Sequence, residues 1–150
     1  MTNSGTITPR LGLPLIEPGQ AQKEWFHNES LLLLDGAVQA SVMAVGTDMP
    51  PAAAVPGEGW VVGATPVDQW SGHRHELAIR TDGGWRFLPA IEGMAVWDRA
   101  TDCLWRHRSG MWLCGNAIMP PSGGATVDQE ARRTLAAVIE LLRGHGLAAE

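Results

Sequence analysis

Two histidines and a glutamate stand close together near the middle of the chain, at His73, His75 and Glu76. If this segment is a strand, the imidazoles at i and i+2 share a face and can ligate one metal ion. The alternative is a polar loop that holds two unrelated histidines. Because the chain contains no ligand spacing such as CxxC or HExxH, we favour the loop and predict no metal and no cofactor.

Acidic side chains are spread through the same region, at Glu58, Asp68, Glu76, Asp82, Glu92, Asp98 and Asp102. A pair of carboxylates beside an aromatic groove is the machinery of glycoside hydrolysis. Most of these residues occupy predicted turns, where acidic side chains are common, and no pair is singled out. We therefore predict a protein without catalytic residues, which is not an enzyme.

Cys103 and Cys114 flank a predicted hairpin and can lie opposite each other. A disulfide between them is compatible with that placement. The N-terminus has no charged-then-apolar signal pattern, so we expect synthesis in the bacterial cytoplasm without a signal peptide. Thiols are kept reduced there, and for that reason we favour two free cysteines.

Tryptophan dominates the aromatic residues, with seven copies against two phenylalanines and no tyrosine. Six of them fall in the middle of the chain, at Trp60, Trp70, Trp85, Trp97, Trp105 and Trp112. Aromatic residues at strand spacing, separated by Gly and Asp turns, predict a compact antiparallel meander. Most of these indoles are expected to form its core, since a small β module without tyrosine uses tryptophan for bulk burial.

Exposed tryptophans offer a second interpretation, because their faces stack on sugar rings. We expect Trp70 or Trp105 to be exposed, and Trp70 lies in a Gly/Ser loop with His73. A carbohydrate-binding module that recognises host surface polysaccharide is therefore the alternative function, and its candidate residues are Trp70, His73, Trp85 and Trp105.

The elements that position these residues predict an α+β fold. It comprises an N-terminal arm and helix, a central Trp-rich antiparallel β-meander and a C-terminal helix. Pro9 and Pro14 prevent a helix in the arm. The predicted parts are an extended arm at 1–19, a helix plus β domain at 20–114, a linker at 115–126 and a helical segment at 127–150. Strands are expected at 59–63, 76–80, 85–88, 94–98, 103–107 and 111–114.

The two predicted helices carry apolar surface that one small domain does not hide. The first spans 20–43, with Val38 and Val42 extending its apolar face. The second begins at a Thr126 cap, and Ala131, Leu135, Val138 and Leu142 give it a heptad-like seam. This surface predicts a homo-oligomer. The expected interface residues are Leu11, Leu13, Leu31, Leu32, Leu135, Val138 and Leu142.

Composition excludes two classes of partner. The net charge is −5, and the basic residues are scattered rather than gathered in a stripe. A phosphate-tracking surface needs such a stripe, so we expect no nucleic-acid partner. No run approaches the roughly 20 apolar residues of a membrane span, so we expect no membrane insertion.

The N-terminal motifs resemble the opening signature of a domain family found in alphaproteobacterial prophages and gene transfer agents. They are Thr8-Pro9-Arg10-Leu11-Gly12-Leu13-Pro14, Gly19-Gln20-Ala21-Gln22-Lys23-Glu24 and His27-Asn28-Glu29 with Leu34-Asp35. Trp70-Ser71-Gly72-His73, Trp85-Arg86-Phe87, Glu92-Gly93 and His145-Gly146-Leu147 are also similar to it. The resemblance implies a virion-associated structural protein of the fibre or spike class, whose partners are other virion proteins. Fibre and spike proteins are trimeric, so it also implies a homotrimer.

Overall fold

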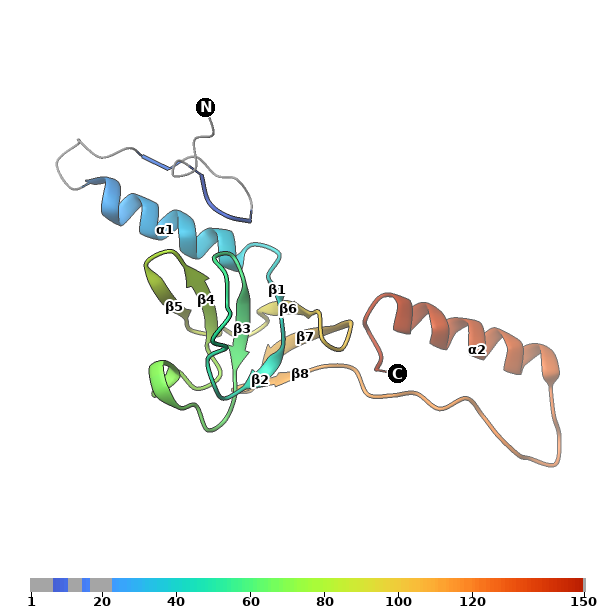
Figure 1. The fold of residues 1–150 in the computed structure, drawn as a ribbon. Coiled ribbons are helices and arrows are strands. Elements are labelled where there is room, and N and C mark those ends of the chain that lie inside the picture. Colours follow the sequence, from blue (N-terminus) through green and yellow to red (C-terminus); the bar gives the residue numbers. More distant parts are fainter. Residues whose placement is uncertain (1–6, 11–14, 17–22, 150) are drawn as a thin grey trace.

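The computed structural model describes residues 7–10, 15–16 and 23–149, and in α1 it describes the side chains from His27 onward. The chain has an α+β fold, as predicted, in which two helices accompany two four-stranded sheets. Helix α1 (Lys23–Ala37) precedes the strands, and helix α2 (Gln129–Gly144) follows them (Figure 1).

Each sheet is a three-stranded antiparallel meander extended by one short parallel strand. The first sheet contains, in spatial order, β2 (Val45–Thr47), β3 (Gly59–Val62), β4 (Leu77–Thr81) and β5 (Gly84–Leu88). The second contains β1 (Ser41–Val42), β6 (Ala95–Asp98), β7 (Cys103–Arg108) and β8 (Met111–Leu113). All six expected strands are present. The division into two sheets and the parallel strands β1 and β2 were not predicted.

The core has two layers because β3 is buried on both faces. Val61 belongs to a cluster shared by the two sheets, which includes Val42, Leu77, Val96 and Trp112. Trp60 points to the opposite side, where it packs with other members of a Trp-rich cluster. Successive side chains of a strand alternate between faces, so β3 separates an aliphatic layer from an aromatic one.

Helix α1 is shorter than predicted, and the expectation that Val38 and Val42 continue it was wrong. The helix ends at Ala37, and the left-handed φ of +47° at Gln39 turns the chain into β1. Val42 is buried in the core as a strand residue. Gly36, which weakens a helix by about 1 kcal/mol relative to Ala, is required here because a Cβ would collide with the side chain of Ile79.

Helix α2 stands away from both sheets (Figure 1). Its N-cap is Asp128, whose carboxylate accepts hydrogen bonds from the backbone N–H groups of Glu130 and Ala131. The predicted cap at Thr126 was therefore wrong by two residues. After the helix, the chain returns to the second sheet, where the Leu104 N–H donates to the Gly146 carbonyl at 2.9 Å. Neither α1 nor α2, the α-helices in the described part of the chain, is long and apolar enough to cross a membrane.

Candidate functional site

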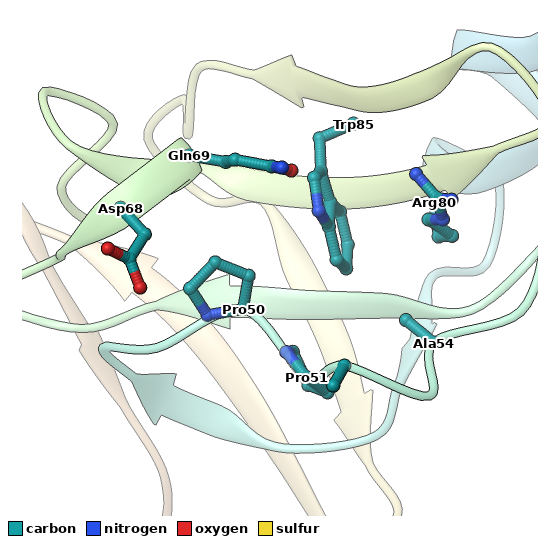
Figure 2. A pocket seen from close by; sticks show the side chains of 8 residues that line it. Pro50, Pro51, Ala54, Asp68, Gln69, Arg80 and Trp85 are labelled. Atoms are coloured by element: carbon teal, nitrogen blue, oxygen red, sulfur yellow. The ribbon is translucent and has the colours of Figure 1, made fainter.

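A hollow of about 510 Å³ opens on the outer face of the first sheet, beside Trp85 (Figure 2). The loop after β2, the 3-10 turn Asp68–Trp70 and strands β4 and β5 supply its walls. Its lining residues are Pro50, Pro51, Ala52, Ala54, Asp68, Gln69, Arg80 and Trp85. Apolar and charged side chains thus meet in one concave surface.

Trp85 is the accessible member of a three-indole cluster. Its ring meets those of Trp60 and Trp70 edge to face, with centroids 5.5 Å and 5.0 Å away. Trp60 and Trp70 are buried, whereas Trp85 is half-buried and lines the hollow. Edge-to-face pairs of this kind add roughly 0.5–1.5 kcal/mol each beyond area burial, so the Trp85 indole is held in one orientation.

Polar groups surround this indole. The Arg80 guanidinium lies 5.7 Å from the centroid of the Trp85 ring. In Figure 2, Gln69 and Arg80 lie on either side of Trp85, and Gln69 points toward the ring. Within the part of the chain that the structure describes, neither Arg80 nor Asp68 forms an ion pair. Both charges are available to a ligand.

Of the four predicted carbohydrate-binding residues, Trp85 alone lines this hollow. Trp70 is completely buried, so the expectation that it is exposed was wrong. Its ring anchors the 3-10 turn beneath Trp85. His73 stacks on Phe87 at 3.5 Å between centroids, and its Nδ1 lies 2.8 Å from a Glu76 carboxylate oxygen. Trp105 is half-buried on β7, in the other sheet.

The remaining lining residues escaped the sequence reading. Asp68 and Gln69 precede Trp70 directly, so the pattern placed the correct segment but selected its inward side chain. The signal that identifies the hollow is the Pro50-Pro51 pair, which builds a rigid loop opposite the indole. A strand pattern also does not show that Arg80 of β4 and Trp85 of β5 are paired across the hairpin.

The two histidines of the candidate metal site have separate partners. They lie in a turn before β4 rather than on a strand. His73 pairs with Glu76, while His75 Nδ1 lies 3.0 Å from the Gly110 carbonyl oxygen at the tip of the β7–β8 hairpin. The loop interpretation is confirmed.

Cys103 and Cys114 are free thiols. Cys103 begins β7 and is buried, and Cys114 directly follows β8. Burial raises the pKa of the Cys103 thiol, and the neighbouring Cys114 raises it further. Both line a second hollow, of about 430 Å³, beside the returning C-terminal segment.

Helix α2 presents an uncovered apolar stripe. Leu135, Val138 and Leu141 are 49%, 44% and 59% exposed, and Leu142 is half-buried. The linker covers a different face of the helix, where Arg132 donates to the Pro121 carbonyl at 3.3 Å and Arg143 to the Ile118 carbonyl at 3.4 Å. These arginines share their face with Ile139, the buried residue of α2.

The N-terminal signature residues are structural. The buried Asp35 carboxylate accepts hydrogen bonds from Thr8 Oγ1 at 2.8 Å and from the Arg10 N–H at 2.9 Å. The Arg10 guanidinium donates to carbonyls at the C-terminal end of α1, including those of Gly36 and Gln39. A cation there complements the helix dipole. The arm is thereby fastened to the helix end.

The rest of that signature joins α1 to its surroundings. The Arg86 guanidinium of β5 pairs with the Glu29 carboxylate, and the Asn28 amide forms two hydrogen bonds with the backbone of Ile16. The predicted hydrogen bonding from helix to β region is confirmed. Of the predicted interface residues, Leu31 and Leu32 are half-buried, and Leu11 and Leu13 lie outside the described residues.

Comparison with known proteins adds one match. A family model described as a protein of unknown function, DUF2793, matches residues 27–113, which is more than half of the chain. The matched segment runs from the first described side chain of α1 to the end of β8. It therefore contains the Trp85 hollow and excludes α2. No curated protein matches the chain.

Proposed function

The chain belongs to the DUF2793 family, whose function is unknown, and we propose that it is a structural component of a phage or gene-transfer-agent particle that acts through assembly. Its role is that of a fibre or spike, or of the module that attaches one. The motifs quoted above support the particle, because they are similar to sequences of prophages and gene transfer agents. The shape of the molecule supports the assembly.

The observation that carries the proposal is the apolar stripe of α2. Ile139 is buried, yet Leu135, Val138 and Leu141 remain exposed on a helix that projects from the β sheets. An isolated helix of this length is marginal in water, and most helices in proteins are stabilised by packing of an apolar face. The stripe is therefore an interface.

A second copy of the same chain is the occupant that the spacing favours. Ala131, Leu135, Val138 and Leu142 step by four, three and four residues, which is the spacing of a coiled-coil seam. Three copies arranged about one axis bring three such seams together in a closed bundle. A three-fold arrangement also matches the symmetry of fibre and spike proteins.

Light scattering coupled to size exclusion tests the assembly at micromolar concentration. The chain has a mass of 16.1 kDa, and we expect a particle of three times that mass. Leu135→Ser with Val138→Ser should give a monomer with unchanged β-sheet circular dichroism. Arg133→Ser with Ala137→Ser is the matched control, because both residues are exposed on α2 away from the stripe, and it should remain a trimer. A monomeric wild-type chain contradicts the assembly.

The particle role has its own test. A tagged chain expressed in an alphaproteobacterium that produces gene transfer agents should sediment with the purified particles. The Leu135→Ser/Val138→Ser variant should be lost from them. A wild-type chain that stays in the supernatant, while the particles form normally, contradicts a structural role in that particle.

A further inference from the structure

We propose that the hollow beside Trp85 binds an acidic saccharide, with a sugar ring on the indole and a carboxylate of the sugar at Arg80. The hollow lies on the first sheet, and the apolar stripe lies on α2. The proposal therefore goes beyond assembly and does not depend on it. It also replaces the earlier set of candidate residues with Asp68, Gln69, Arg80 and Trp85.

The indole provides the platform. Sugar rings expose C–H groups on one face, and that face packs on a flat aromatic surface. Trp85 is accessible from the hollow but is held from behind by the buried Trp60 and Trp70, at 5.5 Å and 5.0 Å between centroids. Because the ring is already ordered, binding costs little side-chain entropy.

Arg80 supplies the preference for an acid. Its guanidinium lies over Trp85 and forms no ion pair with any described residue, so its five N–H donors can meet a ligand carboxylate. Arginine binds carboxylates in a bidentate geometry that neutral hydroxyls do not reproduce. The chain as a whole carries a net charge of −5. An acidic ligand therefore depends strongly on this one local cation.

Asp68 and Gln69 suit the hydroxyl edge of the same ring. A carboxylate accepts hydrogen bonds from neighbouring hydroxyls, and an amide both donates and accepts. Asp68 adopts a left-handed φ of +51°, a conformation that costs of order 1–3 kcal/mol in a residue with a side chain. The 3-10 turn and the buried Trp70 hold it there. The volume of about 510 Å³ lies within the range of roughly 300–1,000 Å³ found for ligand pockets.

Isothermal titration with galacturonic acid tetramer and with its methyl ester tests the proposal. The two probes share every hydroxyl and differ in the charge that faces Arg80. We expect the acid to bind about tenfold more tightly than the ester, the size of effect that a charge-assisted pair provides. A set of neutral and uronic-acid oligosaccharides on an array extends the test to other sugar stereochemistries.

Variants separate the parts of the site. Arg80→Met keeps an apolar stem against Trp85 and should abolish the preference for acid over ester. Arg106→Met, at an exposed arginine of the second sheet, is the matched control and should bind like wild type. Trp85→Ala should abolish binding of both probes. Because Trp85 also packs on two indoles, near-ultraviolet circular dichroism must show a folded variant, and Gln69→Ala provides a weaker variant at an exposed position.

Three results overturn the proposal. One is an array on which no uronic-acid glycan binds. Another is equal affinity for acid and ester in the wild-type chain, which leaves a neutral sugar site and removes the role of Arg80. The third is binding that survives Trp85→Ala in a folded protein. None of these results bears on the trimer, because the hollow variants leave α2 unchanged.

Discussion

The β region and the α2 arm are built from similar amounts of apolar residue but use them in opposite ways. In the β region, Trp60, Trp70 and Val62 are buried within one chain and support a single accessible indole. In the arm, Ile139 is buried and the neighbouring stripe is exposed. One region completes its core alone, and the other needs a partner. Assembly and ligand binding are thus assigned to separate parts of the fold.

Trp70→Ala should break the self-sufficient region and have the largest effect. The side chain is completely buried and contacts the Trp60 and Trp85 rings. Its truncation should lower the free energy of unfolding by about 3–5 kcal/mol, the range for a buried large aromatic residue. Urea denaturation measures the loss.

The control for this prediction is Gln69→Ala, at the exposed neighbour, which should be nearly neutral. Trp70→Phe should cost less than Trp70→Ala, since it also removes an indole N–H that has no hydrogen-bond partner. A stable Trp70→Ala variant that loses saccharide binding would instead return Trp70 to the ligand site.

Asp35→Ala should loosen the join between the arm and α1. The substitution leaves Thr8 Oγ1 and the Arg10 N–H without their acceptor. A buried group left in this way costs about 1–3 kcal/mol of stability. Thermal unfolding monitors the loss, and Asp82→Ala in the exposed β4–β5 turn is the comparison variant. Equal stability of the two variants would show that the signature motif does not fasten the arm.

Much of the β region followed from the sequence because local signals and burial agree there. Asp82-Gly83-Gly84 marks a hairpin turn, and the strands on either side of it appear where expected. The parallel strands β1 and β2 were missed, since pairs and triplets of residues carry no periodicity. Helix α1 was overextended because Val42 continues the helical spacing, and the turn at Gln39 has no signal in its residue type.

The candidate site was less predictable for a physical reason. Residue type identifies tryptophans, but the direction of each side chain depends on which sheet face a turn meets. Trp70 lies inside the protein and its neighbour Gln69 lies outside, although the loop looks exposed as a whole. Arg80 enters the site through cross-strand pairing with Trp85. Its role appears only when the strands are placed side by side.

Asp128→Ala sharpens the comparison by acting on the arm alone. Asp128 caps α2 through the N–H groups of Glu130 and Ala131, both at 3.0 Å. Loss of a cap costs about 1 kcal/mol, so the α2 amides should exchange with solvent about fivefold faster. Amides of β3 and β4 should be unaffected. Thr126→Ala is the control because Asp128 holds the cap position, and faster exchange in the sheets would show that the two regions unfold as one.

The smallest effect concerns Cys103 and appears only in alkaline solution. Burial, with a further contribution from Cys114, raises the pKa of this thiol above its ordinary value of 9.0. The unfolded chain therefore releases the proton at a lower pH than the folded chain does. The stabilisation is complete below pH 9.0 and is lost as the pH rises through the higher folded pKa. Urea titrations from about pH 8 to about pH 11 should show a decline that is shallower in Cys103→Ala than in the wild-type chain. The comparison uses the slope with pH, because the cavity left by the substitution lowers stability at every pH. An unchanged slope would mean that solvent reaches Cys103, and that the returning C-terminal segment does not close the second sheet as tightly as the aromatic cluster closes the first.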